Sequence, residues 1–193
     1  MTCRIAGPDD VEEEVFCSYL IACDGGRSSV RGRLGIELSG RPDLSKFVSI
    51  YFRAPEFTRA RDFGHANIFF PLHRDHRGFL LNWDGGITFT YHVILEDDQS
   101  WEDVDPTAAI HGVLGRPTPV EILSIQPWTA HALVADRYRQ GRVFLAGNAV
   151  HLFSPTGGFG MNTGVSDVID LAWKIEACLD GWAGPRLLDS YEA

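Results

Sequence analysis

Two short apolar runs, each followed at once by glycine-rich sequence, stand near the two ends of the chain. Residues 19–23 are apolar and precede Asp24-Gly25-Gly26, and residues 142–146 precede a glycine-rich loop that covers residues 147–160. Short apolar runs bounded by turn residues are typical of buried strands. The pattern therefore predicts two buried strands, each leading directly into a loop.

A helix is expected after each of these loops. The first covers residues 28–34. The second covers residues 162–180, where apolar residues recur at helical spacing and Gly181 provides a stop signal. The apolar positions that form its stripe are Val165, Val168, Ile169, Ala172, Ile175 and Leu179.

The middle of the chain shows the alternation of apolar and polar residues that is typical of strands. Strands are expected over residues 47–52, 66–70, 78–83 and 87–95, and the last two flank the turn Asp84-Gly85-Gly86, a hairpin signal. Residues 121–130 predict a further strand, interrupted at Pro127. A short helix is expected over residues 106–114, with Asp105 as N-cap and Pro106 at its first position. This part predicts a mostly antiparallel sheet with one or two helices.

Composition and charge exclude several classes of protein. The chain has 193 residues, of which 45% are hydrophobic, and a formal net charge of −9. An acidic chain without a basic run is a poor ligand for nucleic acids or anionic membranes. No apolar stretch approaches the roughly 18–20 residues that span a bilayer, and residues 1–10 lack the apolar segment of a signal peptide. Four scattered cysteines without a C-x-x-C motif predict reduced thiols in a cytoplasmic protein, with neither a disulfide framework nor a metal site.

Each strand-to-loop junction carries candidate binding groups. In the loop of residues 147–160, glycines allow a ligand close to the backbone, and the following helix offers free N–H groups and a partial positive charge. In the first junction, Asp24 or Ser28 can cap the helix, Asp24 can bind a ligand hydroxyl, and Arg27 or Arg31 can pair with a phosphate. Considered singly, the loop of residues 147–160 is explained equally well as a simple turn. The residues after the first strand are explained better by helix capping and surface charge than by ligand binding.

Taken together, the motifs resemble those of the class A flavoprotein aromatic hydroxylases, the para-hydroxybenzoate hydroxylase family. The family pattern C-D-G-x-x-S-x-V-R is matched at residues 23–31, and P-x-G-G-x-G-x-N at residues 155–162. G-D-A-x-H is matched at residues 147–151, D-x-x-x-L-x-W-K at 167–174 and L-L-x-S-Y-E at 187–192, except that Asn148 replaces the usual aspartate.

The resemblance implies an α/β (α+β) fold in three segments. Residues 1–36 and 141–193 would form a partial FAD-binding Rossmann-like domain that carries the Asp-Gly motif in its first segment and the Gly-Asp-like motif and C-terminal helix in its second. Residues 37–140 would form a substrate-binding domain around a mostly antiparallel sheet.

The family binds FAD and uses NAD(P)H and O2 to hydroxylate phenolic or polycyclic aromatic compounds, so the same cofactors and a small aromatic substrate are expected here. In such proteins the helix N-terminus stabilises negative charge on the reduced flavin. The FAD-binding residues that the resemblance implies are Asp24, Arg27, Arg31, Gly147, Asn148, Pro155, Gly157, Gly158, Gly160, Met161 and Asn162; it assigns no catalytic residue. Two alternatives stay open: a non-catalytic or auxiliary binding protein of the same fold, and a flavin-dependent enzyme that does not oxygenate, such as a cyclase.

Two departures from the family pattern affect these expectations. Asn148 can still accept a hydrogen bond from a ribityl hydroxyl but carries no charge. Family members begin with a βαβ unit whose G-x-G-x-x-G turn holds the ADP half of FAD, and no G-x-G-x-x-G occurs in this sequence. We therefore expect the N-terminal Rossmann unit to be lacking, as in a fragment, a split protein or an open reading frame started late. Hydroxylation would then require that unit from elsewhere, for example from a separate chain.

Aromatic residues and histidines are frequent in the middle of the chain, and each has an ordinary structural explanation. Its aromatic residues are expected to form mainly the core of the sheet, with some lining an aromatic pocket. Histidines at positions 65, 73, 76 and 92 are expected to lie on the surface. Near the C-terminus, His151 is expected to make a structural hydrogen bond, and Trp173 and Trp182 are expected in the core.

Overall fold

The computed structural model describes residues 1–7, 9, 11–59, 66–155 and 157–192, so His65 lies outside the described part. The chain forms two compact units. Unit 1 comprises Met1–Pro42 and His131–Ala193, and unit 2 comprises Asp43–Ala130. Two long strands, β4 (Leu38–Arg53) and β8 (Glu121–Ala135), cross the boundary between them.

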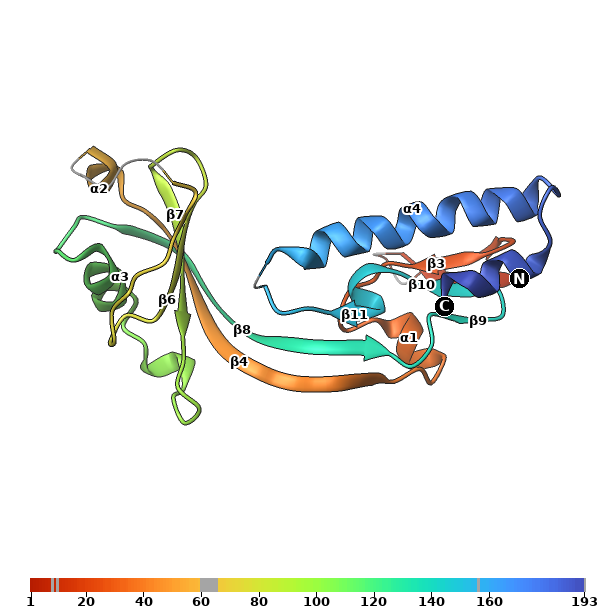
Figure 1. Ribbon diagram of the computed structural model, residues 1–193, viewed down its shortest axis with the longest axis horizontal. Coiled ribbons are helices and arrows are strands. Elements are labelled where there is room, and N and C mark those ends of the chain that lie inside the picture. The colour runs from red at the N-terminus through yellow and green to blue at the C-terminus, as the bar shows by residue number, and fades with distance from the viewer. Residues whose placement is uncertain (8, 10, 60–65, 156, 193) are drawn as a thin grey trace. The chain divides into compact units, whose positions relative to one another are not determined.

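A small sheet forms the centre of unit 1, with strand order β3-β10-β9. Strand β3 (Leu20–Ala22) runs parallel to β10 (Val143–Leu145), which pairs antiparallel with β9 (Arg139–Gln140). Figure 1 shows the long helix α4 (Phe159–Leu179) running beside this sheet. Phe144 of β10 is buried against Leu171 of α4. The two apolar runs of the sequence are thus neighbouring parallel strands.

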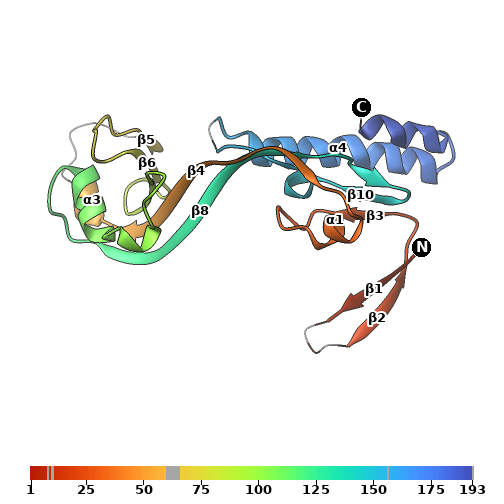
Figure 2. The ribbon, with the colours of Figure 1, turned by 90° about the horizontal axis from the view of Figure 1, so that it is seen from below.

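Short elements complete unit 1. Figure 2 shows a separate two-stranded hairpin before β3, made of β1 (Thr2–Ala6) and β2 (Glu12–Phe16). Strand β11 pairs with the end of β8. The remaining elements are α1 (Ser29–Arg33), η2 (Gly147–Ala149), β11 (His151–Leu152) and η3 (Pro185–Tyr191).

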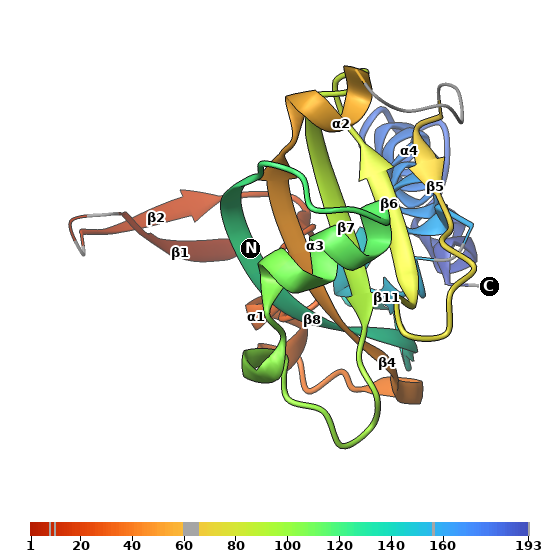
Figure 3. The same ribbon diagram turned by 90° about the vertical axis from the view of Figure 1, so that its left-hand side faces the viewer.

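An antiparallel sheet forms unit 2. Its strands follow the order β4-β7-β6-β5, and β8 lies beside β4. Alternation places Val48, Ile50 and Phe52 of β4 on one face, where α3 (Pro106–Leu114) covers them with the fully buried Ile110 (Figure 3). The other elements are α2 (Pro55–Arg59), β5 (Ile68–Phe69), β6 (Gly78–Asn82), β7 (Thr88–Ile94) and η1 (Trp101–Asp103).

Local signals predicted the elements of unit 2 well. Helix α3 has the predicted bounds, and the Asp105 side chain accepts hydrogen bonds from the backbone N–H groups of Thr107 and Ala108. Asp84 accepts hydrogen bonds from the Thr88 hydroxyl and from three backbone N–H groups in the turn between β6 and β7. The Thr88 hydroxyl above all, with these backbone groups, holds the pKa of Asp84 well below the usual range. A short-range hydrogen bond therefore fixes each of these predicted turns and caps.

Strand β8 differs from the prediction because it continues through Pro127 to Ala135. Proline lacks an N–H group and is tolerated in a strand where that position faces a free edge. The N–H of Ala135 donates to the carbonyl of Val150, the residue before β11, and Pro127 lies an even number of residues earlier. The Pro127 nitrogen therefore faces the edge of β8 that lies away from β4. On this edge β11 pairs only with Leu133 and Val134, so the proline costs no hydrogen bond between β8 and β4.

Helix α4 differs from the prediction in its start and in the face it buries. It starts at Phe159 rather than at residue 162, and its buried residues are Leu171, Lys174 and Ala177. Burial of the Lys174 ammonium group is compensated by two hydrogen bonds, because its Nζ donates to the Asp170 carboxylate at 2.6 Å and to the carbonyl of Ser190 at 3.2 Å.

The predicted apolar stripe of α4 is largely exposed, with Val165 at 53% and Ile169 at 66% exposed. The expectation that Trp173 and Trp182 lie in the core is wrong, since they are 43% and 68% exposed. Spacing identified the apolar positions, but the core of unit 1 contacts a different face of the helix. Within the described ranges, no helix is long and apolar enough to cross a membrane.

Candidate functional site

The two predicted loops lie at the same edge of the small sheet. Strand β3 ends at Ala22 and leads into Cys23 and Asp24, and its parallel neighbour β10 ends at Leu145 and leads into Gly147. In open α/β sheets, ligands bind at the carboxyl ends of the strands. The parallel pairing thus explains why residues more than 100 positions apart share one site.

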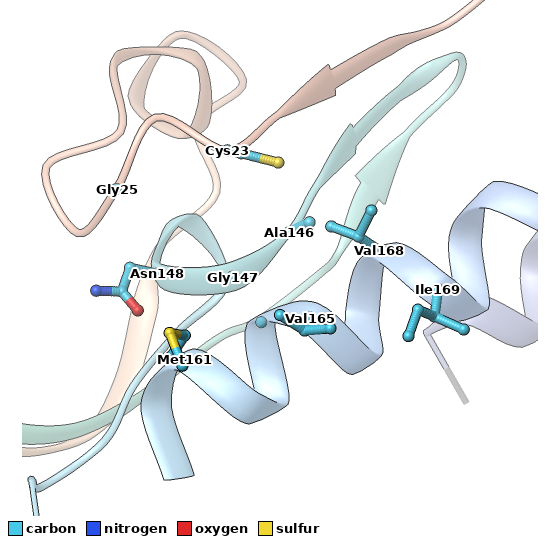
Figure 4. A pocket seen from close by; sticks show the side chains of 10 residues that line it. Cys23, Gly25, Ala146, Gly147, Asn148, Met161, Val165, Val168 and Ile169 are labelled. Carbon is cyan, nitrogen blue, oxygen red and sulfur yellow. The ribbon is translucent and has the colours of Figure 1, made fainter. Parts of the chain in front are cut away.

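A pocket of about 510 Å³ opens at this edge. Figure 4 shows the loops after β3 and β10 on one side and α4 on the other, with Val165 and Val168 carried by the helix. The lining residues are Cys23, Gly25, Ala146, Gly147, Asn148, Met161, Gly164, Val165, Val168 and Ile169. Partial burial, aided by the charges of Asp167 and Asp24, raises the pKa of the Cys23 thiol, which favours its neutral form. The other lining side chains carry no charge, and most of them are apolar.

A contact between two glycines sets the distance between the loop after β10 and α4. A Cβ atom added to Gly164 would lie 3.2 Å from the Cα of Gly147, closer than almost all real contacts of this kind. Gly147 also has a φ of +59°, a left-handed conformation that favours glycine. The close approach of helix and loop therefore depends on the missing side chain of Gly164, whereas a Cβ on Gly147 would lie at an ordinary 3.8 Å and glycine is required there by the backbone conformation.

Asp167 fixes the loop from the helix side. Its Oδ2 atom accepts a hydrogen bond from the Gly147 backbone N–H at 2.8 Å and contacts Nε2 of His151 at 2.7 Å. His151 is only 3% exposed. The structure thus agrees with the prediction of a structural hydrogen bond at His151. Asp167 itself was missed as a site residue, although it begins the D-x-x-x-L-x-W-K motif.

Arg31 links the two loops rather than presenting a free guanidinium group. Its Nη1 donates to the carbonyl of Ala149 at 3.0 Å, and its Nη2 donates to the carbonyl of Gly26 at 2.8 Å. The side chain therefore spans from the segment after β3 to the segment after β10. Arg27, in contrast, is exposed.

Asp24 and Ser28 both hold the start of α1. The Ser28 hydroxyl accepts a hydrogen bond from the N–H of Arg31 at 2.9 Å, and Asp24 accepts one from the N–H of Val30 at 3.2 Å. Desolvation acts to raise the pKa of Asp24, but hydrogen bonds from Ser28 and Val30 outweigh it and lower that pKa. The carboxylate consequently stays ionised beside the pocket.

Only part of the predicted set of binding residues lines the pocket. Gly147, Asn148 and Met161 do so. Pro155, Gly157 and Gly158 are exposed in the loop before α4, with Gly160 and Asn162 in its first turn, where Asn162 Nδ2 donates to the carbonyl of Gly158. Asp24, Arg27 and Arg31 lie outside the lining. Val165, Val168 and Ile169 line it although their spacing only predicted an amphipathic helix.

Unit 2 contains a second cluster of polar and aromatic groups, on the sheet face opposite its core. Ser49 of β4 and His92 of β7 are directly paired, and Ser49 Oγ lies 2.7 Å from His92 Nδ1. Trp128 Nε1 donates to the same hydroxyl at 2.7 Å. Because the indole N–H can only donate, Ser49 accepts from Trp128 and keeps its own proton for a hydrogen bond to Nδ1. When Ser49 donates in this way, the His92 proton lies on Nε2.

Aromatic rings surround this hydrogen-bonded chain. Phe47 stacks on Trp128 with centroids 4.2 Å apart, and Phe79 stacks on His92 at 4.4 Å. Burial lowers the pKa of His92 to about 4. His92 is therefore a half-buried neutral side chain, not the surface histidine that its scattered position suggested. Sequence alone did not bring out Ser49 or Trp128, because no local motif connects residues 79 positions apart.

Comparison with known proteins agrees with this geometry. The model of the FAD binding domain family matches residues 2–193, and the chain belongs to this family. A putative polyketide hydroxylase of Streptomyces halstedii is 41% identical over 93% of this chain and 33% of its own length. A 4-methyl-5-nitrocatechol 5-monooxygenase of Burkholderia sp is 40% identical over 94% of this chain and 35% of its own length.

The solved structures give the same result. The structure of aklavinone-11 hydroxylase with FAD and aklavinone superimposes with a TM-score of 0.91 at 36% identity, covering 98% of this chain and 36% of that one. The chain thus spans about a third of the length of the relatives it matches. The resemblance to the flavoprotein aromatic hydroxylases is confirmed, as is the α/β fold with a mostly antiparallel sheet.

Replacing Asp167 should destabilise the loop after β10. Asp167→Ala leaves the Gly147 N–H and the buried His151 ring without their shared acceptor, so we expect the free energy of unfolding to fall by about 2–3 kcal/mol. Ser166→Ala, at the exposed neighbour, should change it by less than about 0.5 kcal/mol. Urea unfolding of both variants measures the difference, and equal stability of the two would contradict the role given to Asp167.

His92 should make stability depend on pH. Its pKa of about 4 in the folded protein lies below the unfolded value of about 6.5, so only the unfolded chain takes up this proton between the two values. The free energy of unfolding of the wild type should fall as the pH falls from about 6.5 to about 4. Urea unfolding of wild type and His92→Gln across this range separates the contribution of His92 to the free energy of unfolding from that of the other titrating groups. A difference between them that stays constant with pH would refute it.

Proposed function

We propose that this chain provides the FAD-binding and aromatic-binding parts of a flavin-dependent hydroxylase that acts on phenolic or polycyclic aromatic compounds. The observation that carries the proposal is the pocket of unit 1, where the Gly147–Gly164 contact brings α4 beside the carboxyl ends of two parallel strands. Such an edge, with glycines and a helix start, is suited to a dinucleotide cofactor.

The residues present fit FAD. The apolar side chains of Met161, Val165 and Val168 form a wall suited to a flat ring system, and Gly147 and Gly164 leave space that Cβ atoms would fill. Asn148 would accept a hydrogen bond from the ribityl chain. The N-terminal N–H groups of α4 would stabilise negative charge on the reduced ring. When bound, FAD would supply the redox chemistry, with NAD(P)H as reductant and O2 as oxidant.

The other predicted binding residues divide into two roles in this proposal. Asp24 is ionised and exposed near the pocket, so it would accept hydrogen bonds from cofactor hydroxyl groups. The exposed Arg27 would pair with a phosphate. Arg31 would act indirectly, since both ends of its guanidinium group already bind backbone carbonyls. Pro155, Gly157, Gly158, Gly160 and Asn162 would shape the loop before α4 and the first turn of that helix.

The cluster in unit 2 suits the binding of an aromatic hydroxyl compound. Phe47, Phe79 and Trp128 provide ring surfaces, and none of the described residues accepts a hydrogen bond from His92 Nε2. A phenol oxygen could take that position. The names of the relatives, a polyketide hydroxylase and a nitrocatechol monooxygenase, indicate the same substrate class.

The exposed stripe of α4 supports a partner for unit 1. Val165 and Ile169 are more than half exposed, and β3 forms an outer edge of its three-stranded sheet. A separate chain with a nucleotide-binding βαβ unit would extend the sheet along β3 and cover part of the stripe. The ADP half of FAD would then lie on that unit.

Gly164→Val should weaken FAD binding at least tenfold, a change of about 1.4 kcal/mol. Its side chain would push α4 away from Gly147 and fill part of the pocket. Titration of the chain with FAD, followed by the visible flavin absorption, measures the affinity. Gly184→Ala is the control, because a Cβ there meets nothing within 4 Å. Equal affinity of both variants and wild type would place the flavin elsewhere.

The reaction class can be tested by adding phenolic compounds to the chain with FAD, with and without a nucleotide-binding partner chain. A hydroxylase should oxidise NAD(P)H faster with the aromatic compound present and yield a hydroxylated product. We expect His92→Ala to raise the KM for that compound about tenfold, the loss of about one hydrogen bond. Flavin retention without a hydroxylated product would favour a non-oxygenating enzyme such as a cyclase. Failure to bind FAD in both settings would favour a non-catalytic binding protein.

A further inference from the structure

The N-terminal hairpin brings two cysteines together. Cys3 of β1 pairs with Val15 of β2, and Cys17 lies two positions beyond Val15, so both cysteines project from the same face. Their Sγ atoms are 3.6 Å apart. Two hydrogen bonds between Met1 and Cys17, of 2.8 and 3.0 Å, hold this end of the hairpin closed.

We propose that Cys3 and Cys17 form a modification site: a reversible disulfide made by exchange with a low-molecular-weight disulfide such as oxidised glutathione. A disulfide bond is about 2.05 Å long, so the sulfur atoms need to approach by only about 1.5 Å. Rotation of the cysteine side chains can supply much of this approach. The site rests on the hairpin alone and is independent of the proposed function.

The exchange has two steps that balance. One cysteine thiolate attacks a sulfur of oxidised glutathione, forms a mixed disulfide and releases one glutathione thiolate. The thiolate of the second cysteine then attacks the protein-side sulfur, closes the Cys3–Cys17 bond and releases the second glutathione. Two electrons and two protons leave the protein thiols, and one oxidised glutathione becomes two reduced molecules.

The other two cysteines do not share this arrangement. Cys23 lies at the pocket of unit 1, and the Cys178 thiol contacts the carbonyl of Gly184 at 3.5 Å. The hydrogen bond with Cys17 and partial desolvation raise the pKa of Cys3. Exchange should therefore be slow at neutral pH and faster as the pH rises, which suits a thiol pair that stays reduced until an oxidant accumulates.

Oxidation would change the segment that leads into the cofactor pocket. An isolated two-stranded hairpin is marginally stable in water, and a cross-link between positions 14 residues apart restricts its opened forms. Cys17 lies three residues before β3, which leads directly to Cys23 and Gly25 in the pocket lining. The disulfide would therefore fix the approach of the chain to that strand.

The test is to equilibrate the full chain with oxidised glutathione at pH 8, block the remaining thiols and determine the intact mass and the cross-linked peptide. We expect a loss of two hydrogen atoms, two thiols still open to alkylation, and one peptide pair that joins Cys3 to Cys17. Hydrogen exchange of the β1–β2 amides should slow at least about tenfold on oxidation and recover with excess thiol.

Two variants separate this site from random oxidation. Cys17→Ser should give a glutathione adduct at Cys3 in place of the loss of two hydrogen atoms, and Cys23→Ser should cross-link like the wild type. Four free thiols at equilibrium, or a cross-link that includes Cys23 or Cys178, would overturn the proposal. The oxidised and reduced wild type provide the exchange comparison, so this result holds even where a variant folds poorly.

Discussion

The carboxylate of Asp167 accepts a hydrogen bond from the Gly147 backbone N–H and contacts the buried ring of His151. This interaction ties α4 to the loop after β10 at the point where Gly147 and Gly164 are closest. The position of this loop relative to α4 affects the pocket wall. It also affects the Ala149 carbonyl, which accepts a hydrogen bond from Arg31. One side chain on the helix thus helps to fix the backbone of the candidate cofactor site.

The candidate site of unit 1 is formed mainly by backbone groups, whereas that of unit 2 is formed by side chains. In unit 1, glycines and backbone groups form the site, and the polar side chains Asp167 and Arg31 act on backbone atoms. In unit 2, side chains of Ser49, His92 and Trp128 interact directly with one another. A site made from backbone tolerates few changes in residue size, whereas one made from side chains on a regular sheet can be altered one position at a time. The first arrangement suits a constant cofactor, and the second suits substrates that differ between relatives.

Sequence predicted those features that depend on neighbouring residues. The α3 cap at Asp105, the turn at Asp84 and the two strands that precede glycine-rich loops each follow from a few adjacent positions. Features that depend on distant packing were beyond it. Spacing on α4 could not show which face meets Phe144, so Trp173 was assigned to the core wrongly. Alternation in β4 could not show that Ser49 meets Trp128, and no local signal indicated that Arg31 binds Ala149.

Pro127 on the outer edge of β8 has a consequence for how the protein meets other chains. An open strand edge invites pairing with a strand of another molecule, and a proline there removes one of the donors that such pairing needs. The N–H of Ala135, farther along the same edge, donates to the carbonyl of Val150, just before β11. The proline and the short strand β11 thus interrupt the outer edge of β8 at two places, so a strand of another molecule would find fewer free backbone groups with which to pair.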